Sequence, residues 1–238
     1  NYTVSDLKKW DDKICEIAKH HNLDWFEINY EICDYYEMIG HMSYHGMPTH
    51  YDHWSYGKSF ERTHQSYNAG VEGLPYELII NSNPSIAYLM RENPLYLQIL
   101  IMAHCVGHSD FFKNNRMFKH TRAESVIGRF RAAKKRIQEY VEDPYIGIEK
   151  VEEVIDACHA LQYQILRDGS KRKTHDEHVE YYKGLREYDK DGNLTLFDLD
   201  KPPLEPDVDI MGFIAEHAKM PSWKRDIIEI VRDEAYYF

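Results

Sequence analysis

Residues 102–115 read MAHCVGHSDFFKNN and decide how this sequence is interpreted, because they place two histidines four residues apart in a predicted helix. Apolar residues recur around the histidines at steps of three and four, the spacing of one helical face. The residues at this spacing are Leu97, Ile101, His104, His108 and Phe111. We therefore expect both imidazoles to point inward, in a helical core built around this helix. Two inward histidines could bind one metal ion, or they could be core residues that hydrogen-bond to other groups.

The composition narrows the classes of protein and partner. The chain has 238 residues and a formal net charge of -11, so it lacks the broad basic surface that binding to nucleic acid requires. The basic segment 129–136 is interpreted as the solvated face of a helix. No apolar run is long enough for a membrane span, residues 1–10 do not resemble a signal peptide, and the four cysteines form no CxxC pair. We expect a cytoplasmic protein with reduced thiols and no nucleotide cofactor.

The order of the predicted elements indicates a mainly α fold with a small β element (α+β). Apolar spacing and capping residues predict helices over 5–21, 35–42, 85–91, 94–112, 123–141, 148–167, 209–217 and 222–236. Alternating apolar residues predict strands over 26–32 and 76–81, and residues 43–59 are expected to form an ordered loop. We expect a core domain over 1–167, a charged linker or mobile lobe over 168–208, and C-terminal helices over 209–238 that pack back on the core.

The spacing of His104 and His108 resembles the zinc-protease pattern HExxH, in which the glutamate is the general base. Cys105 stands at the glutamate position, so the protease mechanism cannot be transferred. A base must come from another segment, and Glu77 on the predicted strand YELIIN is the leading candidate. His159, at the edge of the apolar stripe of the 148–167 helix, is a candidate third ligand or a boundary histidine that hydrogen-bonds elsewhere. Zinc is the first choice of metal for histidine and carboxylate ligands, with iron or manganese as alternatives.

A second group of candidates lies in the aromatic loop and at a strand end. His50 and His53 bracket an aspartate and are candidate acid–base residues. The candidate pocket residues are Tyr56, Lys58, Asn81 and Asn83. The alternatives are a buried loop whose polar groups satisfy its own backbone, and a turn held by the asparagine side chains.

Five segments of this chain resemble the stage V sporulation protein R family. They are GMPTHYDHWSYGKSF at 46–60, YELIINSNP at 76–84, MAHCVGHSDFFKNN at 102–115, CHALQ at 158–162 and PSWKRDIIEIVRDEAYYF at 221–238. The resemblance implies a role in spore cortex formation. Members of this family are generally longer at the C-terminus, so the resemblance also implies that this chain is a truncated portion.

Two functions remain open at this point. The first is a metal-dependent hydrolase, for example an amidase acting on cell-wall material, with His104 and His108 as ligands and Glu77 as ligand or base. The second is a non-catalytic assembly or regulatory factor in spore formation, with other spore proteins as partners. The segment EYDKDGNLTLFD at 187–198 superficially matches a calcium loop, but its first and last positions are wrong for one. We interpret it as a hairpin turn at Asp191 and Gly192.

Overall fold

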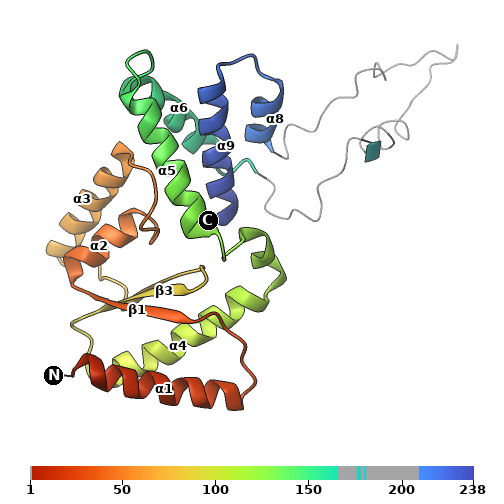
Figure 1. The fold of residues 1–238 in the computed structure, drawn as a ribbon. Coiled ribbons are helices and arrows are strands. Elements are labelled where there is room, and N and C mark those ends of the chain that lie inside the picture. The colour runs from red at the N-terminus through yellow and green to blue at the C-terminus, as the bar shows by residue number, and fades with distance from the viewer. Residues whose placement is uncertain (1, 166–175, 178–179, 181–208) are drawn as a thin grey trace, which may run out of the picture. The chain divides into compact units, whose positions relative to one another are not determined.

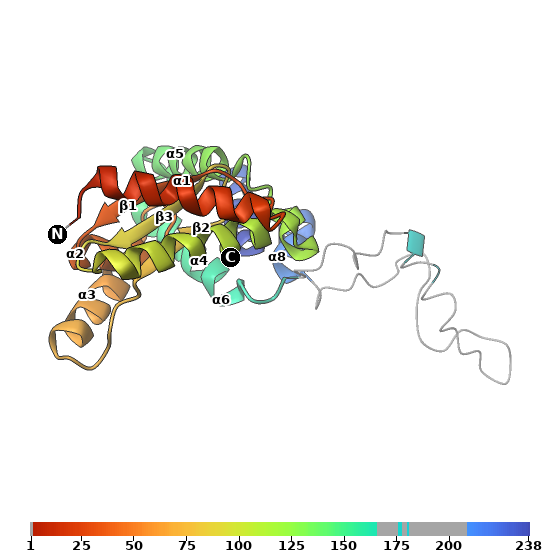
Figure 2. The same ribbon diagram turned by 90° about the horizontal axis from the view of Figure 1, so that it is seen from below.

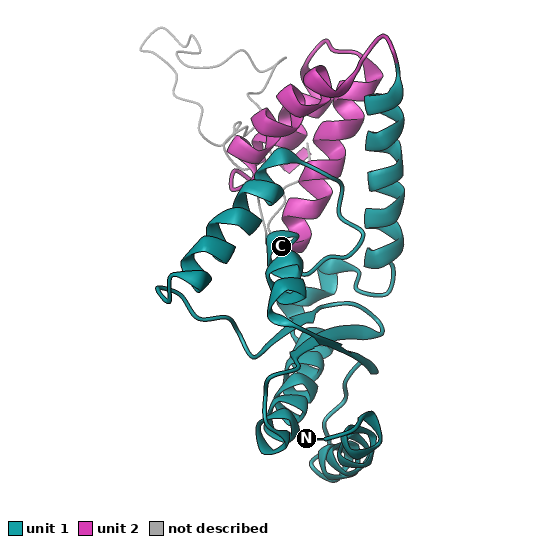
Figure 3. Cartoon of the chain, turned by 90° about the vertical axis from the view of Figure 1, so that its left-hand side faces the viewer, with its two compact units in different colours: residues 1–143 teal, residues 144–238 magenta. Residues whose placement is uncertain are grey.

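The computed structural model describes residues 2–165, 176–177, 180 and 209–238 (Figure 1). It divides into two compact units, residues 1–143 and residues 144–238 (Figure 3). Helices dominate both units and a three-stranded sheet lies in the first, so the predicted fold class is confirmed. Among the described residues, no helix combines the length and the apolar character that crossing a membrane requires.

The sheet contains β1 (Ile28–Cys33), β2 (Glu77–Ile80) and β3 (Ser85–Met90) in the order β1-β3-β2. β3 pairs in parallel with β1 and antiparallel with β2, so the last strand in the sequence is the central strand in space. The prediction of a helix over 85–91 is therefore wrong. The segment SIAYLM is a short apolar run that is buried on both faces of the sheet, and the spacing of such a run does not distinguish strand from helix.

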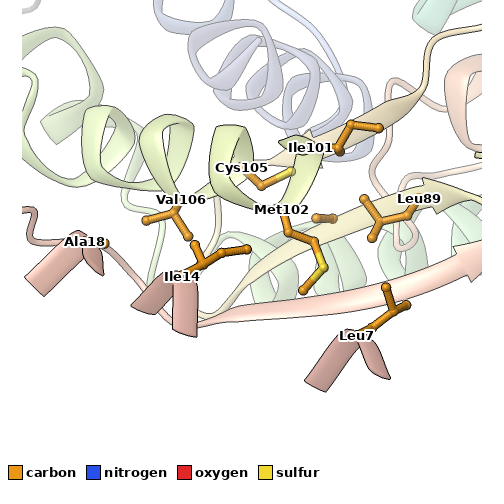
Figure 4. Close-up of a cluster of buried hydrophobic side chains, with 9 residues drawn as sticks. Leu7, Ile14, Ala18, Leu89, Ile101, Met102, Cys105 and Val106 are labelled. Carbon is orange, nitrogen blue, oxygen red and sulfur yellow. The ribbon is translucent and has the colours of Figure 1, made fainter. Parts of the chain in front are cut away.

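Helices cover both faces of the sheet (Figures 1 and 2). One face packs against α4 (Leu95–Asn114), which lies beside α1 (Val4–His20). Their shared core includes Ala87 and Leu89 of β3 (Figure 4). The other face packs against α2 (Tyr35–Ser43), and α3 (Trp54–Asn68) packs on α2. Tyr88, between Ala87 and Leu89 in β3, points to this second face. Its ring stacks on His41 of α2, with centroids 3.7 Å apart.

Capping residues determine where two helices begin. Thr3 and Asp6 form a capping box at the start of α1, so this helix begins at Val4, one residue before the predicted start at residue 5. Asp34 and Glu37 form the same arrangement at the start of α2. The predicted loop 43–59 is a loop as far as His53, and its remaining residues form the first turns of α3.

The remaining helices of the first unit are the 3-10 helix η1 (Arg116–Thr121) and α5 (Val126–Glu142). The second unit contains α6 (Ile148–Leu161), α8 (Ile210–His217) and α9 (Ser222–Tyr237), and α9 packs on both α6 and α8. Asp209 caps α8 and accepts a hydrogen bond from Arg232 of α9 at 2.9 Å. α6 thus groups with the C-terminal helices, whereas the expected domain boundary lies at residue 167. The expected linker over 168–208 and the turn at residues 191 and 192 lie outside the described residues.

Candidate metal centre

Glu77 is placed by the register of the sheet edge. It is the first residue of β2 and pairs with Leu89 of β3. Paired residues point to the same face of a sheet, and Leu89 belongs to the core shared with α1 and α4. Glu77 therefore lies on the face that α4 covers, at the open edge of the sheet, with 20% of its side chain exposed.

Two histidines of α4 meet this carboxylate. His104 and His108 are one helical turn apart, and their Nε2 atoms are 2.8 Å from each other. His104 Nε2 is 3.6 Å from Glu77 Oε1. The three residues together offer one ligand atom each, and these atoms all lie within 4.8 Å of one another. We call Glu77, His104 and His108 the metal cluster; they are the three residues with suitable spacing in the part of the chain that the structure describes.

The expectation that both histidines point into the core is wrong. His104 is 57% exposed, and Phe111 of the same proposed face is also exposed. The buried residues of α4 are Gln98, Ile101, Met102, Cys105, Val106 and Ser109. The inward face therefore lies on a different side of the helix from the histidines and includes two polar residues. α4 carries apolar residues around most of its circumference, so their spacing alone could not orient it.

The protonation of the histidine pair follows from its geometry. At 2.8 Å one Nε2 atom must donate a proton and the other must accept it, so at least one ring is neutral. Burial, followed by the neighbouring His104, lowers the pKa of His108, while Glu77 acts in the opposite direction. Burial also raises the pKa of Cys105 to about 12, with a smaller contribution from Glu77. Cys105 is therefore a protonated core residue rather than a thiolate ligand.

These three residues fit a divalent metal ion. Two ligand atoms bound tetrahedrally to zinc at about 2.1 Å are about 3.4 Å apart. Two of the three separations in the metal cluster, 2.8 Å and 3.6 Å, bracket this distance, and the third is within 4.8 Å, so side-chain rotations can bring the three atoms to one ion. Two imidazoles and one carboxylate form the ligand set of many catalytic zinc sites, and also of non-haem iron sites. Because His104 is exposed, solvent can reach a fourth position.

Phe112 is a residue of this site that sequence reasoning did not single out. Its ring stacks on that of His108, with centroids 6.0 Å apart and an interplanar angle of 22°. We expect this contact to restrict the rotation of the His108 ring and so to orient its Nε2 atom. Phe112 follows His108 by four residues on the same helix, and this spacing could have predicted the contact from the sequence.

The loop histidines form a separate arrangement. His50 and His53 are almost completely buried. His50 Nδ1 lies 3.2 Å from the carbonyl oxygen of Tyr51, and its Nε2 lies 3.4 Å from the hydroxyl of Tyr56. His53 caps α3, with Nδ1 at 2.7 Å from the hydroxyl of Ser55. The contacts of His50 and of His53 Nδ1 agree with a buried loop whose polar groups bond within the loop and the start of α3. A catalytic role for the two histidines stays a prediction.

The other candidate residues are distributed over several elements. Lys58 is exposed, with its ammonium 5.6 Å from the ring centroid of Trp54. The Asn81 amide donates a hydrogen bond to Thr121 Oγ1 at 2.9 Å, and the Asn83 backbone N–H donates one to the carbonyl of residue 123. The two asparagines therefore join the end of β2 to the segment around η1. His159 lies on α6 in the second unit, and its role as a ligand stays a prediction.

Comparison with known proteins gives one family and one curated relative. The family model described as SpoVR like protein matches residues 1–238. The uncharacterized protein YcgB of Escherichia coli (strain K12) is 36% identical over 260 residues. This match covers 100% of the chain and 50% of that protein, so the chain spans about half the length of the curated relative. No solved structure matches the chain.

Proposed function

The chain belongs to the SpoVR family, which relates it to sporulation proteins, and from this premise and the metal cluster we propose that it is a metal-dependent hydrolase. The observation that carries the proposal is the convergence of Glu77, His104 and His108 from two elements on one point at the protein surface. Zinc is the first choice of metal. An amide bond in cell-wall material is the substrate that we propose.

The three side chains have distinct roles in this proposal. His104 and His108 bind through their Nε2 atoms, which approach each other closely. Glu77 is the third ligand, because three protein ligands are the usual set for catalytic zinc. The pairing of β2 with β3 holds the backbone of Glu77 in place. A zinc ion held by these three residues would supply Lewis-acid chemistry, which activates water and a carbonyl group for hydrolysis.

The first experiment measures metal content. The chain is purified without chelators and without a metal-affinity tag, and its metals are determined by elemental analysis. We expect about one zinc per chain, and less than about 0.1 per chain in His104→Gln and Glu77→Gln. His20→Gln is the matched control, because His20 is an exposed histidine at the end of α1. Its metal content should equal that of the wild type.

Two results would overturn this proposal. Wild-type protein that contains no metal and binds none on titration would exclude the metal site and leave the assembly factor as the remaining function. Stoichiometric iron in place of zinc would keep the metal site but contradict the hydrolase. With zinc bound, release of amines from cortex-type peptidoglycan fragments by the wild type, and not by Glu77→Gln, is the expected sign of amidase activity.

A further inference from the structure

Positive charge is concentrated in one short segment of this acidic chain. Residues 113–136 contain nine Lys or Arg residues and one carboxylate, Glu124, although the whole chain has a net charge of -11. An anion is therefore repelled by most of the chain and attracted to this segment. The first part of the segment, residues 113–122, covers the end of α4 and the 3-10 helix η1 and contains no Asp or Glu.

The geometry of η1 places two of these cations side by side. In a 3-10 helix, residues three apart lie on the same edge, so the Cα atoms of Arg116 and Lys119 are about 6 Å apart along one edge. Both residues are exposed. Phe118 and Thr121, also three residues apart, occupy the edge that faces the protein, where Thr121 is buried. We call Arg116 and Lys119 the cation pair.

The cation pair differs from the lysines of α5 in its partners. Lys134 Nζ lies 3.0 Å from Asp52 Oδ1, and Lys135 Nζ lies 3.8 Å from Glu139 Oε1. In the part of the chain that the structure describes, no carboxylate pairs with either member of the cation pair. Two neighbouring cations repel each other, and an anion that accepts hydrogen bonds from both removes this repulsion. The cation pair is therefore available to a ligand.

η1 is fixed to both elements that carry the metal cluster. Phe118 packs on Phe112 of α4, with ring centroids 5.3 Å apart, and Phe112 stacks on His108. Thr121 Oγ1 accepts a hydrogen bond from Asn81, which directly follows β2. From His108 to the end of α4 the helix rises about 9 Å. The cation pair therefore lies on the order of 10–15 Å from the metal cluster.

We propose that the cation pair is an anion subsite of the metal cluster, which binds a carboxylate or phosphate group of the substrate. The proposal rests on the proposed function, because the metal cluster would act on the other end of the same molecule. The distance between the two sites corresponds to about three or four extended residues. The substrate class is therefore an acidic amide whose negative group lies this far from the scissile bond.

The first test measures anion binding in metal-free protein, so its result does not depend on the metal. Inorganic phosphate is added at low ionic strength, and the backbone amide resonances of isotope-labelled protein are followed by NMR. We expect saturable shifts centred on residues 116–121, with a dissociation constant of about 1–10 mM. In Arg116→Gln/Lys119→Gln the affinity should fall at least about 10-fold, because both charged donors are lost.

Two control variants separate a site from general attraction to positive charge. Arg131→Gln/Lys135→Gln removes two exposed cations of α5 from the same basic segment, and it should change the affinity less than about twofold. Arg116→Lys/Lys119→Arg keeps both charges and should bind phosphate within about threefold of the wild type. Equal losses in the two Gln variants, or shifts of equal size over all of residues 113–136, would overturn the anion subsite.

The second test compares substrates and distinguishes the two sources of negative charge. Zinc-loaded protein is given N-acylated peptides of two to five residues that end in a free carboxylate, in an amidated phosphoserine or in a neutral amide. At the preferred length, the better acidic peptide should have a kcat/KM at least about 10-fold above that of the neutral one. Arg116→Gln/Lys119→Gln should abolish this preference by raising KM, with kcat unchanged.

Each outcome of the second test has a separate meaning. The faster of the two acidic series identifies the negative group as carboxylate or phosphate. Equal kcat/KM values for neutral and acidic peptides would overturn the subsite. If the wild type binds no metal or cleaves none of the peptides, the proposed function fails. The phosphate titration then still decides whether the cation pair binds anions, and only its assignment to the metal cluster is lost.

Discussion

The first unit contains two pairs of histidines that look alike in the sequence but differ in burial and in the groups that their nitrogens face. The pair on α4 lies at the surface, where its nitrogens converge on a carboxylate at the edge of the sheet. The pair in the loop before α3 is buried, and three of its four ring nitrogens, both of His50 and Nδ1 of His53, face a backbone carbonyl or a hydroxyl group. From this contrast we propose that the pair on α4 binds a ligand and that the pair in the loop has a structural role.

The largest expected difference between the two groups is in metal affinity. His108→Ala removes one of the three proposed ligands, so we expect the affinity for zinc to fall more than about 100-fold. His50→Ala should change it less than about twofold. Competition with a chromophoric chelator measures both affinities. Equal losses in the two variants would show that the groups form one site and would remove the distinction drawn above.

The second difference is in stability, and it has the opposite order. His50→Ala leaves a cavity and the Tyr56 hydroxyl without its imidazole acceptor, so we expect the free energy of unfolding to fall by about 2–3 kcal/mol. In metal-free protein, His104→Ala should change it by less than about 0.5 kcal/mol, because this side chain is mostly exposed. Urea unfolding followed by tryptophan fluorescence measures both values. A larger loss in His104→Ala would contradict the assignment of roles.

The residues that contact each pair should repeat the contrast on a smaller scale. Tyr56→Phe removes the hydroxyl next to His50, and we expect a loss of about 1 kcal/mol in the free energy of unfolding without a change in zinc affinity. Phe112→Leu removes the ring that stacks on His108, and we expect a several-fold lower zinc affinity instead. Unchanged affinity in Phe112→Leu would show that the stacking does not orient the ligand.

The smallest expected effect concerns pH on the buried side of the sheet. Burial lowers the pKa of His41 below its usual 6.5, although Glu31 and Glu37 act to raise it. The unfolded chain then binds this proton more readily than the folded chain. The contribution of His41 to stability is full above about pH 6.5 and is lost as the pH falls toward the folded-state pKa. Between pH 7.5 and 5.5, urea unfolding should show a smaller loss in His41→Gln than in the wild type.

The sequence predicted the helical character of the chain, two of the three strands and the three residues of the metal cluster as candidates. It did not predict that Ser85–Met90 is the central strand, since a short apolar run of Ile, Ala, Leu and Met suits either structure. It also did not predict which side of α4 faces the core. The sheet decides that orientation, and its register depends on contacts between segments that are far apart in the sequence.

Glu77 lies on β2, an edge strand of the sheet, and this position has a consequence for the stability of that edge. β2 is held to the sheet by its ladder with β3, and strand ends of this kind open more readily than the core. A metal bound by Glu77 and the two histidines of α4 would close a loop that contains all of β3. Part of the free energy of metal binding would then stabilise the pairing of β2 with β3 at the sheet edge. Amide hydrogens of β2 should therefore exchange with solvent more slowly when the protein is saturated with zinc, and addition of a chelator should reverse this protection.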